Sequence, residues 1–242
     1  MLIQTPDGRN VLVDAGDGDS AEDTVAYLKR CAVRRIDLLV ITHPHIDHIG
    51  GLPRILEEFG VSEVVDTGCP HGSRTYREVL SSIEERRIGY RLAAESPSLH
   101  ISKNVGFQII WPPKDYAPSG DSELNDASIV MRVAYKDVSV LLTGDIQLEA
   151  EGRILADNPD LQCTILKIAH HGSAGSTSNE LLQLTKPEFA VISVGADNPY
   201  HHPARRIITS LKATGADLYR TDEDGTVVFA TDGRRVQVTT ER

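Results

Sequence analysis

The chain has 242 residues, 40% of them hydrophobic and 25% charged, which is the composition of a folded domain and not of a disordered or fibrous chain. Its formal net charge of −10 argues against broad electrostatic capture of nucleic acid or of an anionic membrane surface. No run of about 18 apolar residues occurs, and no basic and then apolar leader follows Met1, so we expect neither a membrane span nor a signal peptide, and a cytoplasmic location by default.

The first part of the chain predicts a hairpin followed by alternating helices and strands. Apolar runs on both sides of Pro6-Asp7-Gly8 predict the hairpin, and Ser20 has the side chain expected of a helix N-cap. The predicted helices span 20–33, 50–60 and 73–89, and the predicted strands span 36–42 and 62–68.

The second part changes to consecutive strands and then returns to alternation. The predicted strands span 99–102, 107–111, 128–135, 139–144, 163–169, 189–194 and 217–221, with a polar loop at 112–126. Helices are predicted near 177–185 and 203–214, and a hairpin ends the chain. No linker or repeat divides the sequence, so we predict one α/β domain over 1–242 with its helices on the outside.

The stretch "THPHIDHIGG" at 42–51 concentrates metal-binding residue types directly after a buried strand. It contains His43, His45, Asp47 and His48, and so three of the nine histidines of the chain. Neutral imidazole nitrogens and carboxylate oxygens are the ligands that divalent transition metals take. His43 and His45 are two residues apart and can point the same way, whereas Asp47 and His48 can serve a neighbouring ion.

Three more predicted strands end in residues of the same kind. "LLTGD" ends at Asp145, "LKIAHHGS" contains His170 and His171, and the loop in "VISVGADNPYHHP" contains His201 and His202. Because α/β proteins place their sites at the carboxyl ends of strands, the repetition predicts a metal site built from these loops. Taken alone, Asp145 is equally consistent with a helix N-cap.

These motifs resemble the metallo-β-lactamase superfamily, whose pattern is HxHxDH with GG, then GD, then later histidines. The stretch from Asn125 onward, with "NDASIVMRV", "LKIAHHGS" and "NPYHHP", is similar to the hydrolase domain of ComEC-type DNA-uptake proteins of bacterial competence. The resemblance implies a four-layer αββα sandwich and two metal ions. That branch usually begins with a strand that carries a "DVGQGD"-like loop, so we expect the chain to be truncated or to lack this first N-terminal strand.

The resemblance also implies roles for single residues. The metal ligands that it implies are His43, His45, Asp47, His48, Asp145, His170 and His202, without deciding between His170 and His171. His202 is preferred to His201 because it directly precedes Pro203, as in the family's His-Pro. Asp145 is expected to bridge the two ions, and Asp47, Asp145 and His171 form the expected catalytic group. Asp14 resembles an aspartate that supports the histidine loop through hydrogen bonds.

A third histidine for the first ion is not obvious from the sequence. Only His71 and His100 stand between the first cluster and Asp145, and each is more typical of a structural position. The expected substrate contacts are Asn125, Lys167 and Ser173. Lys167 suits a phosphate, and Ser173 begins a serine-rich run before a helix N-terminus that suits an anion, although such serines equally suit capping of the helix.

The expected chemistry is hydrolysis by a hydroxide that bridges two Zn²⁺ or Mn²⁺ ions about 3.5–4 Å apart. The leading prediction is a dinuclear phosphodiesterase or nuclease, with single-stranded DNA as the candidate substrate. A hydrolase of another ester, thioester or lactam is the alternative, and a non-catalytic binding module that retains a metal is a third. Aromatic residues make up only 5% of the chain, so few rings are available to stack on bases, with Tyr116 and Tyr200 as candidates. The sequence leaves the oligomeric state open.

Overall fold

The computed structural model describes residues 1–116, 118, 120, 123–158 and 160–242. The chain divides into two compact units, which we describe separately. Unit 1 comprises Met1–Val105 and Trp111–Ile129, and unit 2 comprises Gly106–Ile110 and Val130–Arg242.

Unit 1 is built on a sheet with strand order β1-β2-β4-β6-β7. These strands are β1 (Leu2–Gln4), β2 (Asn10–Val13), β4 (Leu38–Ile41), β6 (Glu63–Asp66) and β7 (Gly89–Leu92). The first two strands form the predicted antiparallel hairpin, and the others continue in parallel, with Val13 opposite Val40 and Ile41 opposite Asp66. Parallel order brings the carboxyl ends of β2, β4 and β6 to one edge of the sheet.

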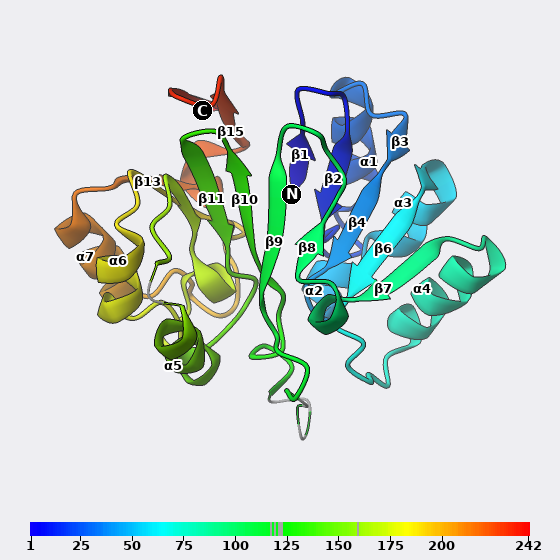
Figure 1. Cartoon of the computed structure of the whole chain (residues 1–242), viewed down its shortest axis with the longest axis horizontal. Coiled ribbons are helices and arrows are strands. Elements are labelled where there is room, and N and C mark those ends of the chain that lie inside the picture. The colour runs from blue at the N-terminus through cyan, green and yellow to red at the C-terminus, as the bar shows by residue number, and fades with distance from the viewer. Residues whose placement is uncertain (117, 119, 121–122, 159) are drawn as a thin grey trace. The chain divides into compact units, whose positions relative to one another are not determined.

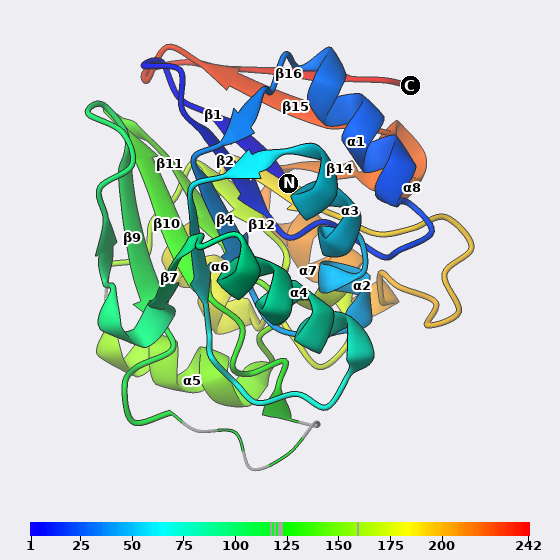
Figure 2. The ribbon, with the colours of Figure 1, turned by 90° about the vertical axis from the view of Figure 1, so that its right-hand side faces the viewer.

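Helices cover one face of this sheet (Figure 2). They are α1 (Ala21–Arg30), α3 (Leu52–Glu58) and α4 (Arg74–Glu85), and α3 packs between the other two. Ser73 caps α4, because its Oγ accepts a hydrogen bond from the Tyr76 amide at 3.1 Å. The core between the sheet and the helices consists mainly of aliphatic side chains, among them Leu12, Val25, Leu28, Leu39, Ile41, Ile55, Leu56, Val64, Val79 and Ile83.

Shorter elements complete unit 1. The strands β3 (Arg35–Ile36) and β5 (Gly60–Val61) form a small parallel pair, and β8 (Ser98–Leu99) follows the 3₁₀ turn η1 (Ala93–Glu95). The four-residue helix α2 (Ile46–Ile49) lies inside the histidine motif.

Unit 2 is built on strands in the order β14-β13-β12-β11-β10-β9. They are β9 (Gly106–Trp111), β10 (Val130–Tyr135), β11 (Val138–Leu142), β12 (Ile165–Lys167), β13 (Phe189–Ile192) and β14 (Asp217–Arg220). β10 and β11 are antiparallel, whereas β11 to β14 are parallel, with Leu142 opposite Lys167 and Lys167 opposite Val191. The loops after β11, β12 and β13 therefore leave the sheet at the same edge.

The helices of unit 2 are α5 (Leu148–Asp157), α6 (Asn179–Thr185), α7 (Arg205–Thr214) and the single turn α8 (Thr221–Asp224). α6 and α7 pack against each other (Figure 1), and Ser178 caps α6 by accepting a hydrogen bond from the Leu181 amide at 3.0 Å. The hairpin of β15 (Val227–Thr231) and β16 (Val236–Thr240) ends the chain, as predicted. None of the helices in the described part of the chain combines the length and the apolar character that crossing a bilayer requires.

Candidate metal centre

The histidine motif occupies the edge of unit 1 where β4 ends. β4 ends at Ile41. His45, the N-cap of α2, has an extended conformation with φ −71° and ψ 149°. His43 therefore lies on the extended segment, and Asp47 and His48 lie on the first turn of the helix. His43 and His48 are buried, whereas the Asp47 side chain is 52% exposed.

His43 and His45 place two ring nitrogens as one metal ion needs them. His43 Nε2 and His45 Nδ1 are 3.1 Å apart, with ring centroids 4.7 Å apart and an interplanar angle of 79°. Two nitrogens bound to one tetrahedral zinc at about 2.0–2.1 Å lie roughly 3.3 Å from each other. The pair thus has the spacing of two ligands of a single ion.

Asp14 and Thr42 fix the orientation of the buried rings. Asp14 Oδ2 accepts hydrogen bonds from Thr42 Oγ1 at 2.7 Å and from His48 Nδ1 at 2.7 Å, and Asp14 Oδ1 accepts one from the Thr42 amide at 2.8 Å. Because the hydroxyl hydrogen of Thr42 points to Asp14, its oxygen can accept from His43 Nδ1, 3.2 Å away. Both rings then keep their Nε2 lone pairs for a metal.

Burial acts to raise the pKa of Asp14, but its interactions with His48, with the Thr42 amide and with His43 together leave the pKa below its ordinary value. Asp14 therefore stays a carboxylate, as an acceptor for both neighbours requires. His48 Nε2 lies 3.8 Å from Asp47 Oδ2, so these two predicted ligands face the same space.

His71 lies closer to the motif than the sequence indicated. Its ring centroid is 6.2 Å from that of His45, and its Nδ1 is 3.1 Å from Ser73 Oγ. The other candidate, His100, is exposed after β8. Of the two, only His71 is in ring contact with a predicted ligand.

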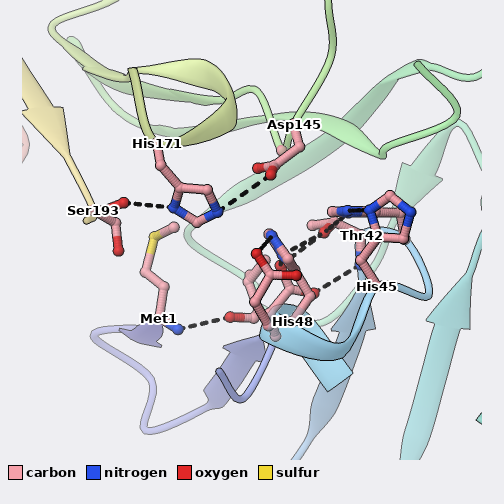
Figure 3. Close-up of polar contacts among 12 residues, drawn as sticks. Met1, Thr42, His45, His48, Asp145, His171 and Ser193 are labelled. Carbon is pink, nitrogen blue, oxygen red and sulfur yellow. Dashed lines mark hydrogen bonds and ion pairs between the residues drawn. The ribbon is translucent and has the colours of Figure 1, made fainter. Parts of the chain in front are cut away.

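Unit 2 brings Asp145 and His171 together (Figure 3). Asp145 follows β11 after Gly144 and is 2% exposed, and His171 belongs to the 3₁₀ turn η3 (Ala169–Gly172) after β12. His171 Nδ1 donates to the Ser193 carbonyl at 2.7 Å, so in the neutral ring Nε2 carries the lone pair. That nitrogen is 3.2 Å from Asp145 Oδ2, and two such donors of electron pairs are suited to share a cation.

The later histidines follow in the same unit. His170 and His202 have ring centroids 5.9 Å apart, and His202 stacks on Tyr200. Asn198 holds the backbone of His202 at both ends, because its Oδ1 accepts from the His202 amide and its Nδ2 donates to the His202 carbonyl. Burial, and then the charge of His171, lowers the pKa of His202, which favours the neutral ring that binds metal. His201 is exposed.

The residues predicted to contact a substrate differ in their hydrogen bonds. Lys167 is buried, and its ammonium donates to the carbonyls of Gly144 and Ile168 at 3.3 Å each, beneath the Asp145 loop. Ser173 Oγ accepts from the Gly175 amide, and Asn125 Oδ1 is buried without a hydrogen-bond partner among the described residues. Their contact with a substrate stays a prediction.

Of the residues that orient the ligands, the sequence indicated Asp14 but not three others. Thr42, Ser193 and Asn198 act through a hydroxyl, a backbone carbonyl and an amide. Thr42 could have been identified from its position directly before the histidine motif, and Asn198 from its position as the first residue of "NPYHHP". A backbone carbonyl acceptor such as that of Ser193 cannot be inferred from the residue type, because every residue has one.

The donors present in the two units suit a divalent transition metal. They are imidazole nitrogens and carboxylate oxygens. In His43, His48 and His171, one ring nitrogen is within hydrogen-bond distance of a protein oxygen. The three cysteines are free thiols. This donor set fits zinc and manganese alike.

Comparison with known proteins gives matches along most of the chain. ComE operon protein 3 of Bacillus subtilis (strain 168) is 30% identical over 205 residues, which are 85% of this chain and 26% of that protein. Ribonuclease Z of Agathobacter rectalis is 41% identical over 171 residues, which are 64% of this chain and 54% of that protein. The chain spans only 26–30% of the length of the first curated relatives it matches.

A solved structure shares the fold. The metallo-beta-lactamase fold protein YhfI from Bacillus subtilis has a TM-score of 0.55 over 98% of this chain and 90% of that chain, at 12% identity. The family model described as metallo-beta-lactamase superfamily matches residues 1–196, which lie in both units. These findings confirm the predicted fold class, and the first relative confirms the resemblance to the ComEC-type branch. The chain belongs to the metallo-β-lactamase superfamily.

Proposed function

We propose that this chain is a divalent-metal-dependent phosphodiesterase. The observation that carries the proposal is the pair of His171 Nε2 and Asp145 Oδ2, 3.2 Å apart, while the other ring nitrogen of His171 donates a hydrogen bond to the Ser193 carbonyl. This arrangement presents two electron-pair donors to a cation. His43 and His45 repeat it in unit 1, at 3.1 Å.

The proposed ligands are the residues that the motifs indicated: His43, His45, Asp47, His48, Asp145, His170 or His171, and His202. When bound, two divalent ions would supply a water of lowered pKa and neutralise charge on the phosphoryl oxygens. Asp47, with its exposed carboxylate, is proposed to orient the attacking water. Asp14 and Thr42 hold the rings of His43 and His48 in the tautomers that leave Nε2 available.

Phosphodiesters are favoured over other esters because of the relatives. A protein named ribonuclease Z matches 64% of this chain, and divalent metal binding is a property of the family. We propose single-stranded DNA as a substrate through the similarity to ComE operon protein 3, and residues 1–242 as one hydrolase domain, since the family match runs through both units.

One panel of substrates tests the proposal. Protein loaded with Zn²⁺ or Mn²⁺ is assayed on bis-(p-nitrophenyl) phosphate, nitrocefin, a thioester, and labelled single- and double-stranded oligonucleotides. We expect turnover of the phosphodiesters with at least one of the metals. Turnover of the thioester or of nitrocefin without cleavage of any phosphodiester would refute the proposal, and inactivity on the whole panel in metal-loaded protein would favour the binding module.

A further inference from the structure

Four rings follow one another in unit 2, beginning at the candidate ligand His171. The ring centroids of His171 and His170 are 6.3 Å apart, those of His170 and His202 are 5.9 Å apart, and those of His202 and Tyr200 are 5.8 Å apart. The first two pairs are T-shaped, with interplanar angles of 69° and 72°, whereas Tyr200 lies within 22° of parallel to His202. The row of rings ends at Tyr200.

The stack on His202 leaves most of Tyr200 in solvent. The side chain of Tyr200 is 75% exposed, more than any other exposed large hydrophobic residue in the described part of the chain. A tyrosine normally contributes by burying its ring and satisfying its hydroxyl. The loop itself is held, because Asn198 bonds to the Gly195 carbonyl and to both backbone groups of His202. An ordered loop thus presents an aromatic face to solvent.

Groups suited to a phosphate follow within a few residues. α7 begins at Arg205, and its N-cap Ala204 has no side chain to cap the first amides, which also have no acidic neighbour in the first turn. The guanidinium of Arg206 donates to the carbonyls of Ala174, Ser176 and Thr177, whereas Arg205 is exposed. A helix N-terminus without a side-chain cap and an exposed cation favour an anion at this turn.

We propose that Tyr200 is a nucleobase-stacking residue that makes single-stranded nucleic acid the preferred substrate class; this inference rests on the proposed phosphodiesterase function. A base of a single strand has a free aromatic face, whereas a base within a duplex is already stacked on its neighbours. With a net charge of −10 the chain can neutralise few phosphates at once, so base stacking contributes a larger share of the binding free energy than charge does. Arg205 would then contact the phosphate next to the stacked base.

The test compares two single strands of equal length and equal charge, one of deoxythymidines and one of abasic units. Binding of each labelled strand to the metal-loaded protein is measured by fluorescence anisotropy, and turnover of bis-(p-nitrophenyl) phosphate is recorded separately. We expect wild-type protein to bind the base-bearing strand about tenfold more tightly, the order that one stacked base contributes. Y200A and Y200L should lose this preference, and Y200F and Y200W should keep it.

Val228→Ala is the matched control, because it removes another exposed apolar side chain of unit 2, on β15. It should keep the wild-type ratio of affinities. A ratio near one in wild-type protein, or an unchanged ratio in Y200A, overturns the inference. Absence of phosphodiester turnover in wild-type protein that still shows the base preference would instead remove the proposed reaction and leave base stacking in place.

Discussion

In His48 and in His171, one ring nitrogen is hydrogen-bonded to a protein oxygen and the other faces a carboxylate. In His48 the acceptor is the side chain of Asp14, and in His171 it is the backbone carbonyl of Ser193. Because a neutral imidazole has one donor and one acceptor nitrogen, each acceptor selects the tautomer. Orientation of the ligands therefore depends on residues that themselves bind no metal.

Asp145→Ala should abolish hydrolysis and reduce the metal content while the chain stays folded. Asp145 is 2% exposed and its Oδ2 faces His171 Nε2, so the alanine removes a buried carboxylate oxygen beside this candidate ligand. We expect the loss of activity to exceed about 100-fold, the upper range for residues that only support ligands. Activity, metal content and circular dichroism are measured on the same preparation. Full activity in a folded variant would contradict this role.

Asp14→Asn should weaken metal binding by about 10–100-fold without removing a ligand. The amide can accept at one atom only, so it cannot hold the Thr42 hydroxyl, the Thr42 amide and His48 Nδ1 together. Competition with a chelating dye gives the affinity. Asp17→Asn, on an exposed loop close by in sequence, is the control. An affinity equal to that of the wild type would show that the rings are oriented without Asp14.

His202→Ala should lose more metal or activity than His201→Ala. His202 is in ring contact with His170, its backbone is fixed by Asn198, and burial lowers its pKa, whereas His201 is exposed. Metal content and turnover of the two single variants decide between them. The reverse order of effects would assign the ligand to His201.

At the scale of elements, the close approach of two loops explains the glycines of the histidine motif. A Cβ on Gly50 would lie 2.4 Å from the Gly18 amide nitrogen and 2.6 Å from the Ile46 carbonyl oxygen, and one on Gly51 would lie 2.6 Å from the Ala15 carbonyl oxygen. These contacts are backbone atoms, so no side chain can move aside. The pair of glycines lets α2 pack against the loop that follows Asp14.

Gly50→Ala should therefore destabilise unit 1 by about 1–3 kcal/mol, the range for overpacking. Its φ of −58° is ordinary, so the effect is steric and not conformational. Thermal unfolding measures the change, and Gly60→Ala, where a Cβ meets nothing within 4 Å, is the matched control. Equal melting temperatures for the two variants would contradict the steric argument.

Most elements could be predicted from the sequence, because apolar runs and turn residues mark them. The hairpin before Asp14, the strand before His43 and the helix capped by Ser73 are confirmed. Helix α5 (Leu148–Asp157) and strand β7 (Gly89–Leu92) were not predicted. α5 begins at the exposed Leu148 without a capping side chain, and β7 is an edge strand with exposed residues, so neither carries the usual signals.

At the scale of the whole molecule, each unit places its chemical groups where its parallel strands end. β4 leads to His43 and His45, β11 to Asp145, and β12 to His171. The sequence could indicate these ligands because residue type and strand ends are both visible in it. It could not indicate that His71 contacts His45 or that a carbonyl of Ser193 orients His171, since both depend on how loops fold in three dimensions.

Removal of metal should lower the melting temperature, and reconstitution should restore it with more than one equivalent of metal per chain. Ligands that bind a metal only in the folded state add stability, on the order of 2.7 kcal/mol when free metal is about 100 times the dissociation constant. Elemental analysis and thermal unfolding with and without a chelator measure both effects. A metal content of zero after reconstitution would refute the metal site.

The turn that carries His170 and His171 has a further consequence. Both residues adopt left-handed conformations, with φ of 49° and 53°, which cost a residue other than glycine about 1–2 kcal/mol each. Glycine would relieve this strain but would remove the imidazole. Selection for stability and selection for hydrolysis therefore act in opposite directions at these two positions. A lineage released from selection on activity is expected to lose its histidines here first, and to gain thermal stability as it does so.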